Sequence, residues 1–154
     1  MKLVLKDHMT KKLITVSRTA SAAEAQRLMA NYWIRHLPVM DEQEDYIVGM
    51  LSDRDLIRAP SAEVSVDTLM TSPIKTFDIE TPIADVVDGM IEEKVSAFLI
   101  TKKDEVVGIV TSEDMLIVLH QILNKEDGIT WNLSEILVNP ALQRAAYLVG
   151  QAGI

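Results

Sequence analysis

The 154-residue sequence contains no cysteine, no long hydrophobic run and no excess of basic residues. Without cysteine there is neither a disulfide framework nor a thiolate metal site, and the composition agrees with a cytoplasmic protein. No apolar run approaches the roughly 18 residues of a transmembrane helix, and the apolar run at residues 3–5 is far too short for the core of a signal peptide. The sequence therefore predicts neither a membrane span nor a cleaved leader.

Negative charge dominates the ionisable residues. There are 23 acidic and 15 basic residues, a formal net charge of −8, and the pI is about 4.8. Duplex nucleic acid and anionic membrane surfaces are unsuitable partners, because both attract a basic face. The content of 48% hydrophobic and 25% charged residues is instead typical of a globular domain with a substantial core.

The sequence contains two copies of one pattern. Residues 9–40 correspond without a gap to residues 70–101, 61 positions later, and residues 49–56 correspond to residues 108–115. Only the acidic loop 41–45 adds two residues to the first copy. Internal repetition predicts a pseudo-two-fold arrangement, with two related clefts where the copies meet.

Each copy is predicted to follow the order strand, helix, strand, strand, helix, which makes the chain an α/β (α+β) protein. Apolar spacing and N-terminal caps indicate the first helix of each copy. Thr19 or Ser21 can cap the first, with Glu24 placed to form a capping box with Ser21, and Thr81 caps a helix that opens with Pro82. Pro38 indicates a strand that lies at a sheet edge or starts there, and loop 41–45 is expected to be a solvated turn. The expected ranges are strands 13–16, 37–40 and 46–51 with helices 22–33 and from residue 52 or 53, then strands 74–77, 95–101 and 105–110 with helices 82–93 and 112–123.

The domain organisation follows from the duplication. We expect the first repeat at residues 1–60 and the second at residues 61–125, packed together as one domain, because a unit of about 50 residues buries too little surface to be stable alone. Residues 126–154 form an apolar extension, in which Asn132 and Pro140 are predicted to start two short helices. This extension either covers the protein's own core or forms a subunit or partner contact.

A hydroxyl–acid pair follows the last predicted strand of each copy, as Ser52-x-x-Asp55 and as Thr111-x-x-Asp114. A helix N-terminus presents free N–H groups and a partial positive charge, so that a phosphate can bind there beside the hydroxyl. The aspartate, in the first turn, can accept from the cis-diol of a ribose. The same spacing is nearly that of a capping box, so a purely structural role is the alternative.

Three blocks of sequence occur in the same order in both copies. They are Asp7-His8-Met9-Thr10 with Leu69-Met70-Thr71, residues 34–39 with residues 95–100, and the two Gly-x-x-[Ser/Thr]-x-x-Asp turns. This pattern resembles a tandem pair of cystathionine-β-synthase (CBS) domains, the Bateman module. The resemblance covers about residues 3–123, and the second copy departs from it with Leu99 at a position where proline is usual.

The resemblance implies a β-α-β-β-α repeat, clefts between the repeats that bind adenosine-containing ligands, and dimers in the form of a flat disc. The ligands of the family include AMP, ADP, ATP, S-adenosylmethionine, NAD and cyclic di-AMP. The first cleft would combine Asp55 with Lys75, and the second Asp114 with Ile14. The implied roles are ribose binding by Asp55 and Asp114, phosphate contact by Ser52 and Thr111, adenine contact through the backbones of Ile14 and Lys75, and a place near the ligand for Met9 and its counterpart Met70.

The two predicted clefts differ in charge. The residues near the first aspartate are Arg54, Arg35 and His36, and their counterparts in the second copy are Glu113, Ser96 and Ala97. Because charge-assisted hydrogen bonds to arginine are strong, a phosphate is expected to prefer the Arg54 side. The alternative for Arg54 is a solvated residue that pairs with Asp53 or Asp55.

The sequence shows no set of nucleophile, base and orienting residue, no Gly-x-Ser-x-Gly elbow and no Walker loop, and His8, His36 and His120 have no metal-binding spacing. We therefore expect a non-enzymatic regulatory module without metal or required cofactor, which binds an AMP/ADP/ATP-like nucleotide, forms a homodimer and signals through its oligomer or through a partner, with residues 126–154 as the candidate contact. One alternative is a structural dimerisation module with empty clefts. Another is an enzyme with paired carboxylates, which would need raised pKa values that polar helix starts do not favour.

Overall fold

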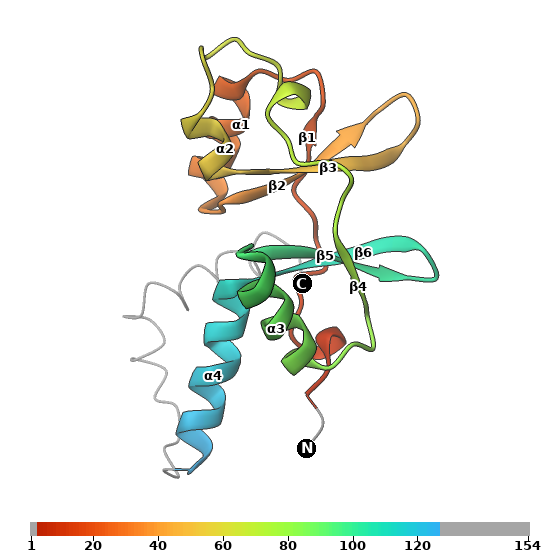
Figure 1. Cartoon of the computed structure of the whole chain (residues 1–154), viewed down its shortest axis with the longest axis vertical. Coiled ribbons are helices and arrows are strands. Elements are labelled where there is room, and N and C mark those ends of the chain that lie inside the picture. The colour runs from red at the N-terminus through yellow and green to blue at the C-terminus, as the bar shows by residue number, and fades with distance from the viewer. Residues whose placement is uncertain (1–2, 127–154) are drawn as a thin grey trace.

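The structure, a computed structural model, describes residues 3–126 as two similar units, one above the other in Figure 1. Their three-stranded sheets have the orders β1-β2-β3 and β4-β5-β6. The first unit comprises β1 (Val16–Ser17), α1 (Ala22–Tyr32), β2 (His36–Asp41), β3 (Tyr46–Ser52) and α2 (Asp53–Ile57), and the second comprises β4 (Thr76–Asp78), α3 (Ile83–Glu93), β5 (Ala97–Lys102), β6 (Glu105–Thr111) and α4 (Ser112–Glu126). The predicted order of elements is confirmed in both repeats.

The two sheets share their pairing pattern in detail. In each, the first strand runs parallel to the second, and the second runs antiparallel to the third. The register of β2 shifts between Val39 and Met40, and that of β5 shifts between Ile100 and Thr101, which are the corresponding positions. The duplication therefore extends to the irregularities of the backbone.

The leading strands begin later than predicted, β1 at residue 16 instead of 13 and β4 at residue 76 instead of 74. The late start of β1 is explained by a proline in β2, the strand with which it pairs. Pro38 lies in β2, at the centre of its sheet, so the predicted edge position is wrong. β1 pairs only with Val39 and Met40, so the N–H that proline lacks falls outside the paired stretch. In the second repeat the N–H of Leu99 donates to the carbonyl of Lys75, with an N···O distance of 3.2 Å.

The helix starts confirm one predicted cap and correct another. Ser21 and Glu24 form the predicted capping box at α1. At α3 the cap position is occupied by Pro82 instead of Thr81, and no side chain caps the helix. The N–H of Ile83 instead donates to the carbonyl of Leu3 at 3.0 Å. The start of the chain therefore supplies the partner that the sequence assigned to a threonine hydroxyl.

The first residue of the predicted solvated turn is buried. Asp41 ends β2 with 7% of its surface exposed. Its Oδ2 lies 2.6 Å from Nη1 of Arg18, and its Oδ1 accepts the N–H groups of Gln43 and Glu44. The remainder of the turn, residues 42–45, is exposed as predicted.

Each repeat has a core that is completed by the segment leading into the other repeat. Leu5, fully buried, belongs to the core of the second unit, and Val66, at the corresponding position, is fully buried in the core of the first. Leu5 is held there by its N–H bond to the carbonyl of Thr81 at 3.1 Å, and Val66 by its N–H bond to Ala20 at 2.9 Å. The two units therefore interlock as one folded body.

The crossing of these segments requires two glycines. The backbones of Thr10 and Ile109 exchange hydrogen bonds, as do those of Thr71 and Met50. A Cβ on Gly108 would lie 2.8 Å from the carbonyl oxygen of Thr10, and a Cβ on Gly49 would lie 2.5 Å from the sulfur of Met70. Both glycines allow a chain to pass close to a strand of the opposite repeat.

No helix within residues 3–126 combines the length and apolar character needed to cross a bilayer. The predicted helices at Asn132 and Pro140 and the apolar extension that contains them lie outside the described residues.

Candidate functional site

The hydroxyl–acid pairs form a capping box at the start of each final helix. Oδ2 of Asp55 accepts the N–H and the hydroxyl of Ser52, at 2.8 and 2.7 Å, and the hydroxyl accepts the N–H of Asp55. Thr111 and Asp114 make the same three bonds, with both donors of Thr111 on Oδ2 at 2.7 and 3.0 Å. The structural role that the sequence kept as an alternative is therefore present at both turns.

The environments of the two aspartates differ. Asp55 is 6% exposed, and its second oxygen, Oδ1, accepts a hydrogen bond from Nη2 of Arg58. Isoleucine stands at the corresponding position of the second repeat, residue 117. Burial raises the pKa of Asp114 to about 6, although its bonds from Thr111 act in the opposite direction. The expectation that a polar helix start prevents a raised carboxylate pKa is thus wrong for Asp114, because desolvation outweighs the two hydrogen bonds.

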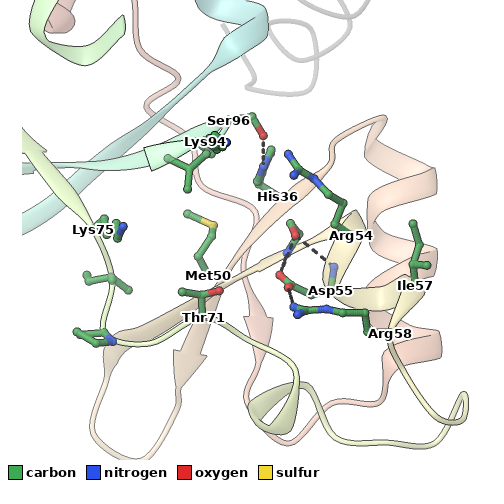
Figure 2. A pocket seen from close by; sticks show the side chains of 15 residues that line it. His36, Met50, Arg54, Asp55, Ile57, Arg58, Thr71, Lys75, Lys94 and Ser96 are labelled. Carbon is green, nitrogen blue, oxygen red and sulfur yellow. Dashed lines mark hydrogen bonds and ion pairs between the residues drawn. The ribbon is translucent and has the colours of Figure 1, made fainter. Parts of the chain in front are cut away.

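A cavity of about 490 Å³ adjoins Asp55 at the boundary between the repeats. Figure 2 shows Asp55 and His36 on one side of it and Lys75 on the other. It is lined by His36, Met50, Ser52, Arg54, Asp55, Ile57, Arg58, Thr71, Pro73, Ile74, Lys75, Lys94, Val95, Ser96 and Ala97. We call this the Asp55 cavity.

Seven of the thirteen predicted site residues line the Asp55 cavity, namely Ser52, Asp55, Arg54, His36, Lys75, Ser96 and Ala97. The other six do not line it. Met70 packs against Gly49, and Met9 packs against Gly108. Ile14 borders the core of the first repeat, Thr111 and Asp114 form the second capping box, and Arg35 is paired with Glu113.

His36 joins the two repeats at the cavity wall. Its Nε2 lies 3.0 Å from the hydroxyl of Ser96, which precedes β5 of the other repeat. Burial, with a smaller contribution from the neighbouring Arg35, lowers the pKa of His36. A neutral imidazole therefore faces the cavity at neutral pH, and it offers a hydrogen-bonding group instead of a positive charge.

The sequence interpretation missed two cationic residues of the cavity. Arg58 follows Asp55 by three positions, which is a spacing that places two helical residues side by side, and this signal was available. Lys94 ends α3 in a left-handed conformation with φ 54°, and only the tertiary structure brings it to the boundary. Together with Arg54 and Lys75 they place four cations and one carboxylate around the cavity of an acidic protein.

The pairing of these charges is uneven. Lys75 forms an ion pair with Glu93, and Arg58 pairs with Asp55. Among residues 3–124, whose side chains the structure describes, Arg54 and Lys94 form no ion pair with an acidic side chain. Of the alternative expected for Arg54, a solvated residue that pairs with Asp53 or Asp55, the exposure is confirmed but neither pair forms. Among the same residues no cluster of three or more His, Asp or Glu side chains is arranged to hold a metal ion.

Comparison with known proteins agrees with the duplicated fold. A family model described as "CBS domain" matches residues 5–62 and again residues 66–121. A homoserine O-acetyltransferase of Methanococcoides burtonii is 30% identical over 111 residues, which make up 71% of this chain and 22% of that protein. An uncharacterized conserved protein from Pyrococcus horikoshii has a similar crystal structure, with TM-score 0.72, 31% identity and coverage of 77% of this chain and 93% of that one.

A second solved structure carries ligands. The CBS domain pair of protein MJ0100, determined in complex with 5′-methylthioadenosine and S-adenosyl-L-methionine, has a TM-score of 0.71 and 27% identity, and the match covers 79% of this chain and 99% of that one. In contrast, the chain spans only 22% of the length of the first curated relatives that it matches, so their enzymatic names describe much longer proteins. From the two family matches and the duplicated fold, we conclude that the chain belongs to the CBS domain family and contains two CBS domains in tandem.

Proposed function

We propose that this CBS pair is a non-enzymatic regulatory module that binds an adenosine-containing nucleotide in the Asp55 cavity. The observation that carries the proposal is the position of a buried carboxylate, Asp55, in a cavity of about 490 Å³ lined from both repeats. This volume lies within the range of typical small-molecule sites. The adenosine compounds bound by the CBS pair of MJ0100 support the ligand class.

The lining residues suit the three parts of a nucleotide. The carboxylate of Asp55 would accept hydrogen bonds from the ribose hydroxyls. The backbone of residues 74–75, ahead of β4, would border the adenine. Arg54 and Lys94 would bind the phosphate, because neither is neutralised by an acidic side chain within the described residues.

Signalling would follow from linkage. The cavity is formed by β2, β3 and α2 of the first repeat, and by residues 71–75 and 94–97 that belong to or lead into the second. A ligand that contacts both repeats would stabilise one relative arrangement of them. It can change a partner or the oligomer only to the extent that it binds one arrangement more tightly than another.

Thermal unfolding with AMP, ADP, ATP, NAD, S-adenosylmethionine and cyclic di-AMP tests the proposal. A ligand present at 100 times its dissociation constant should add about 2.7 kcal/mol to the free energy of unfolding. Asp55→Asn, which keeps an acceptor for Ser52, should reduce this effect, and Asp114→Asn in the other repeat measures any contribution of the second predicted cleft. Failure of every ligand to stabilise the wild type would support the structural module instead, and release of a hydrolysed product would contradict the non-enzymatic assignment.

The proposal includes the homodimer. Large apolar side chains are exposed on α3 and α4, at Ile91, Leu116, Leu119, Ile122 and Leu123. An apolar groove between these helices is lined by residues that include Val87, Met115 and Leu119. Such surfaces in proteins usually mark an interface. Native mass spectrometry should detect a dimer that Leu119→Asp weakens, and a wild-type monomer at micromolar concentration would contradict it.

A further inference from the structure

We propose that Arg58, which donates to Oδ1 of the buried Asp55 at the cavity wall, is a specificity gate that a ligand's phosphate withdraws from the carboxylate. The inference rests on the proposed function and goes beyond it. It states that the Asp55 cavity selects phosphorylated adenosines over adenosine compounds without phosphate, and it names the residue responsible.

The hydrogen bonds of Asp55 leave one oxygen for a ligand. Oδ2 already accepts two bonds from Ser52, which close the capping box. Oδ1 accepts from Arg58. A ribose diol brings two donors and needs acceptor sites on the carboxylate that are free of other partners. Oδ1 has two acceptor sites and Arg58 occupies one of them, so Arg58 competes with the second hydroxyl of the diol.

Arg58 is the member of the pair that can move. Its side chain is 72% exposed, whereas that of Asp55 is 9% exposed and fixed by the capping box. Water can solvate the exposed guanidinium after it leaves the carboxylate, so Arg58 can turn towards another anion without a large desolvation cost of its own. A phosphate, by comparison, offers a guanidinium two parallel charge-assisted hydrogen bonds.

The neighbouring cations determine where the phosphate would lie. Figure 2 shows the side chains of Arg54, which lies in α2, and of Arg58, which directly follows α2, on either side of Asp55. Arg54 forms no ion pair within the described residues and would attract the phosphate first. A phosphate held there gives Arg58 a second partner next to the first.

The second repeat shows that the capping box does not need the arginine. Thr111 and Asp114 form the same box with Ile117 at the position of Arg58, and no described residue donates to Oδ1 of Asp114. Arg58 is therefore an addition to the first repeat only. Because it lies on the surface, its replacement is not expected to disturb the fold.

Calorimetric titration of adenosine, AMP and inorganic pyrophosphate into the full chain tests the gate. We compare the wild type with Arg58→Gln and with the control Arg54→Gln, after checking that all three unfold at similar temperatures. The wild type should bind AMP at least about tenfold more tightly than adenosine. Arg58→Gln should bind AMP more weakly and adenosine more tightly, so that this ratio falls by about tenfold. Arg54→Gln should weaken the binding of AMP and of pyrophosphate and leave the affinity for adenosine unchanged.

Two results would overturn the gate. If Arg58→Gln weakens AMP but leaves adenosine unchanged, as Arg54→Gln does, Arg58 is only a phosphate contact. If Arg58→Gln changes the affinities for AMP and adenosine by the same factor, Arg58 does not discriminate between the two ligands. Failure of the wild type to bind either adenosine or AMP is a separate outcome, which overturns the gate; the proposed function is overturned only if the other ligands of the thermal-unfolding panel also fail to stabilise the protein.

Discussion

Arg35 of the first repeat and Glu113 of the second form an ion pair, with 2.6 Å between Nη2 and Oε1. Burial alone would raise the pKa of Glu113, but hydrogen bonding to its own backbone and the charge of Arg35 hold it below its usual value. The sequence interpretation treated these residues as the charges that distinguish two clefts. Since they neutralise each other, the positive charge of the Asp55 cavity comes from Arg54, Arg58, Lys75 and Lys94.

This ion pair should contribute little to stability. Its side chains are 52% and 40% exposed, so solvent screens the attraction. A double-mutant cycle with Arg35→Ala and Glu113→Ala, measured by urea unfolding, should give a coupling energy of about 0.5 kcal/mol. A coupling of several kcal/mol would show that the pair is a principal link between the repeats, contrary to this expectation.

The raised pKa of Asp114 should make the stability of the protein depend on pH. The pKa rises from about 3.8 to about 6 on folding, so the folded state binds the proton more tightly than the unfolded state. The resulting stabilisation is present below pH 4 and is lost as pH rises to 6. Relative to Asp114→Asn, the wild type should lose about 2–3 kcal/mol between pH 4 and pH 7. Urea titrations at several pH values measure this difference, and a constant difference would contradict it.

The interlocked cores can be tested at Leu5. Leu5→Ala removes a fully buried side chain from the core of the second repeat and should lower the free energy of unfolding by about 2–4 kcal/mol. Ile57→Ala, at a site that is 81% exposed and lies outside the proposed dimer surface, is the control and should change it by less than about 0.5 kcal/mol. Chemical denaturation compares the two variants. Equal, small effects would mean that the N-terminal segment is not part of the core.

The two crossing glycines should differ in their tolerance of alanine. In Gly108→Ala the new methyl would meet a backbone oxygen, that of Thr10, at 2.8 Å, which cannot move without displacing the chain. In Gly49→Ala the nearest atom is the sulfur of Met70, in a flexible side chain, and the nearest backbone oxygen, that of Thr71, lies farther away at 3.0 Å. We expect Gly108→Ala to cost about 1–3 kcal/mol and Gly49→Ala less. Thermal unfolding ranks them, and the reverse order would contradict this packing.

The elements that were predicted correctly depend on local chemistry. Ser21 and Glu24 are three residues apart, and that spacing specifies a capping box whatever surrounds it. The capping role predicted for Thr81 was wrong because the N–H of Ile83, at the start of α3, donates to the carbonyl of Leu3, which is about eighty residues away in the sequence. The edge position predicted for the strand of Pro38 was wrong because β1 is too short to pair with Pro38. The N–H that proline lacks is therefore not needed for pairing, although the strand is central.

The sequence by itself determined the duplication, the β-α-β-β-α order of each repeat and the two hydroxyl–acid turns, because periodicity and capping act over a few neighbouring residues. Only the tertiary structure decided that Leu5 lies in the core of the second repeat and Val66 in the core of the first. It also decided that Arg35 is neutralised by Glu113, and that Lys94 and Lys75 line the same cavity as Asp55. These contacts join residues that are distant along the chain. Their geometry depends on how the two repeats pack, and no local pattern encodes that packing.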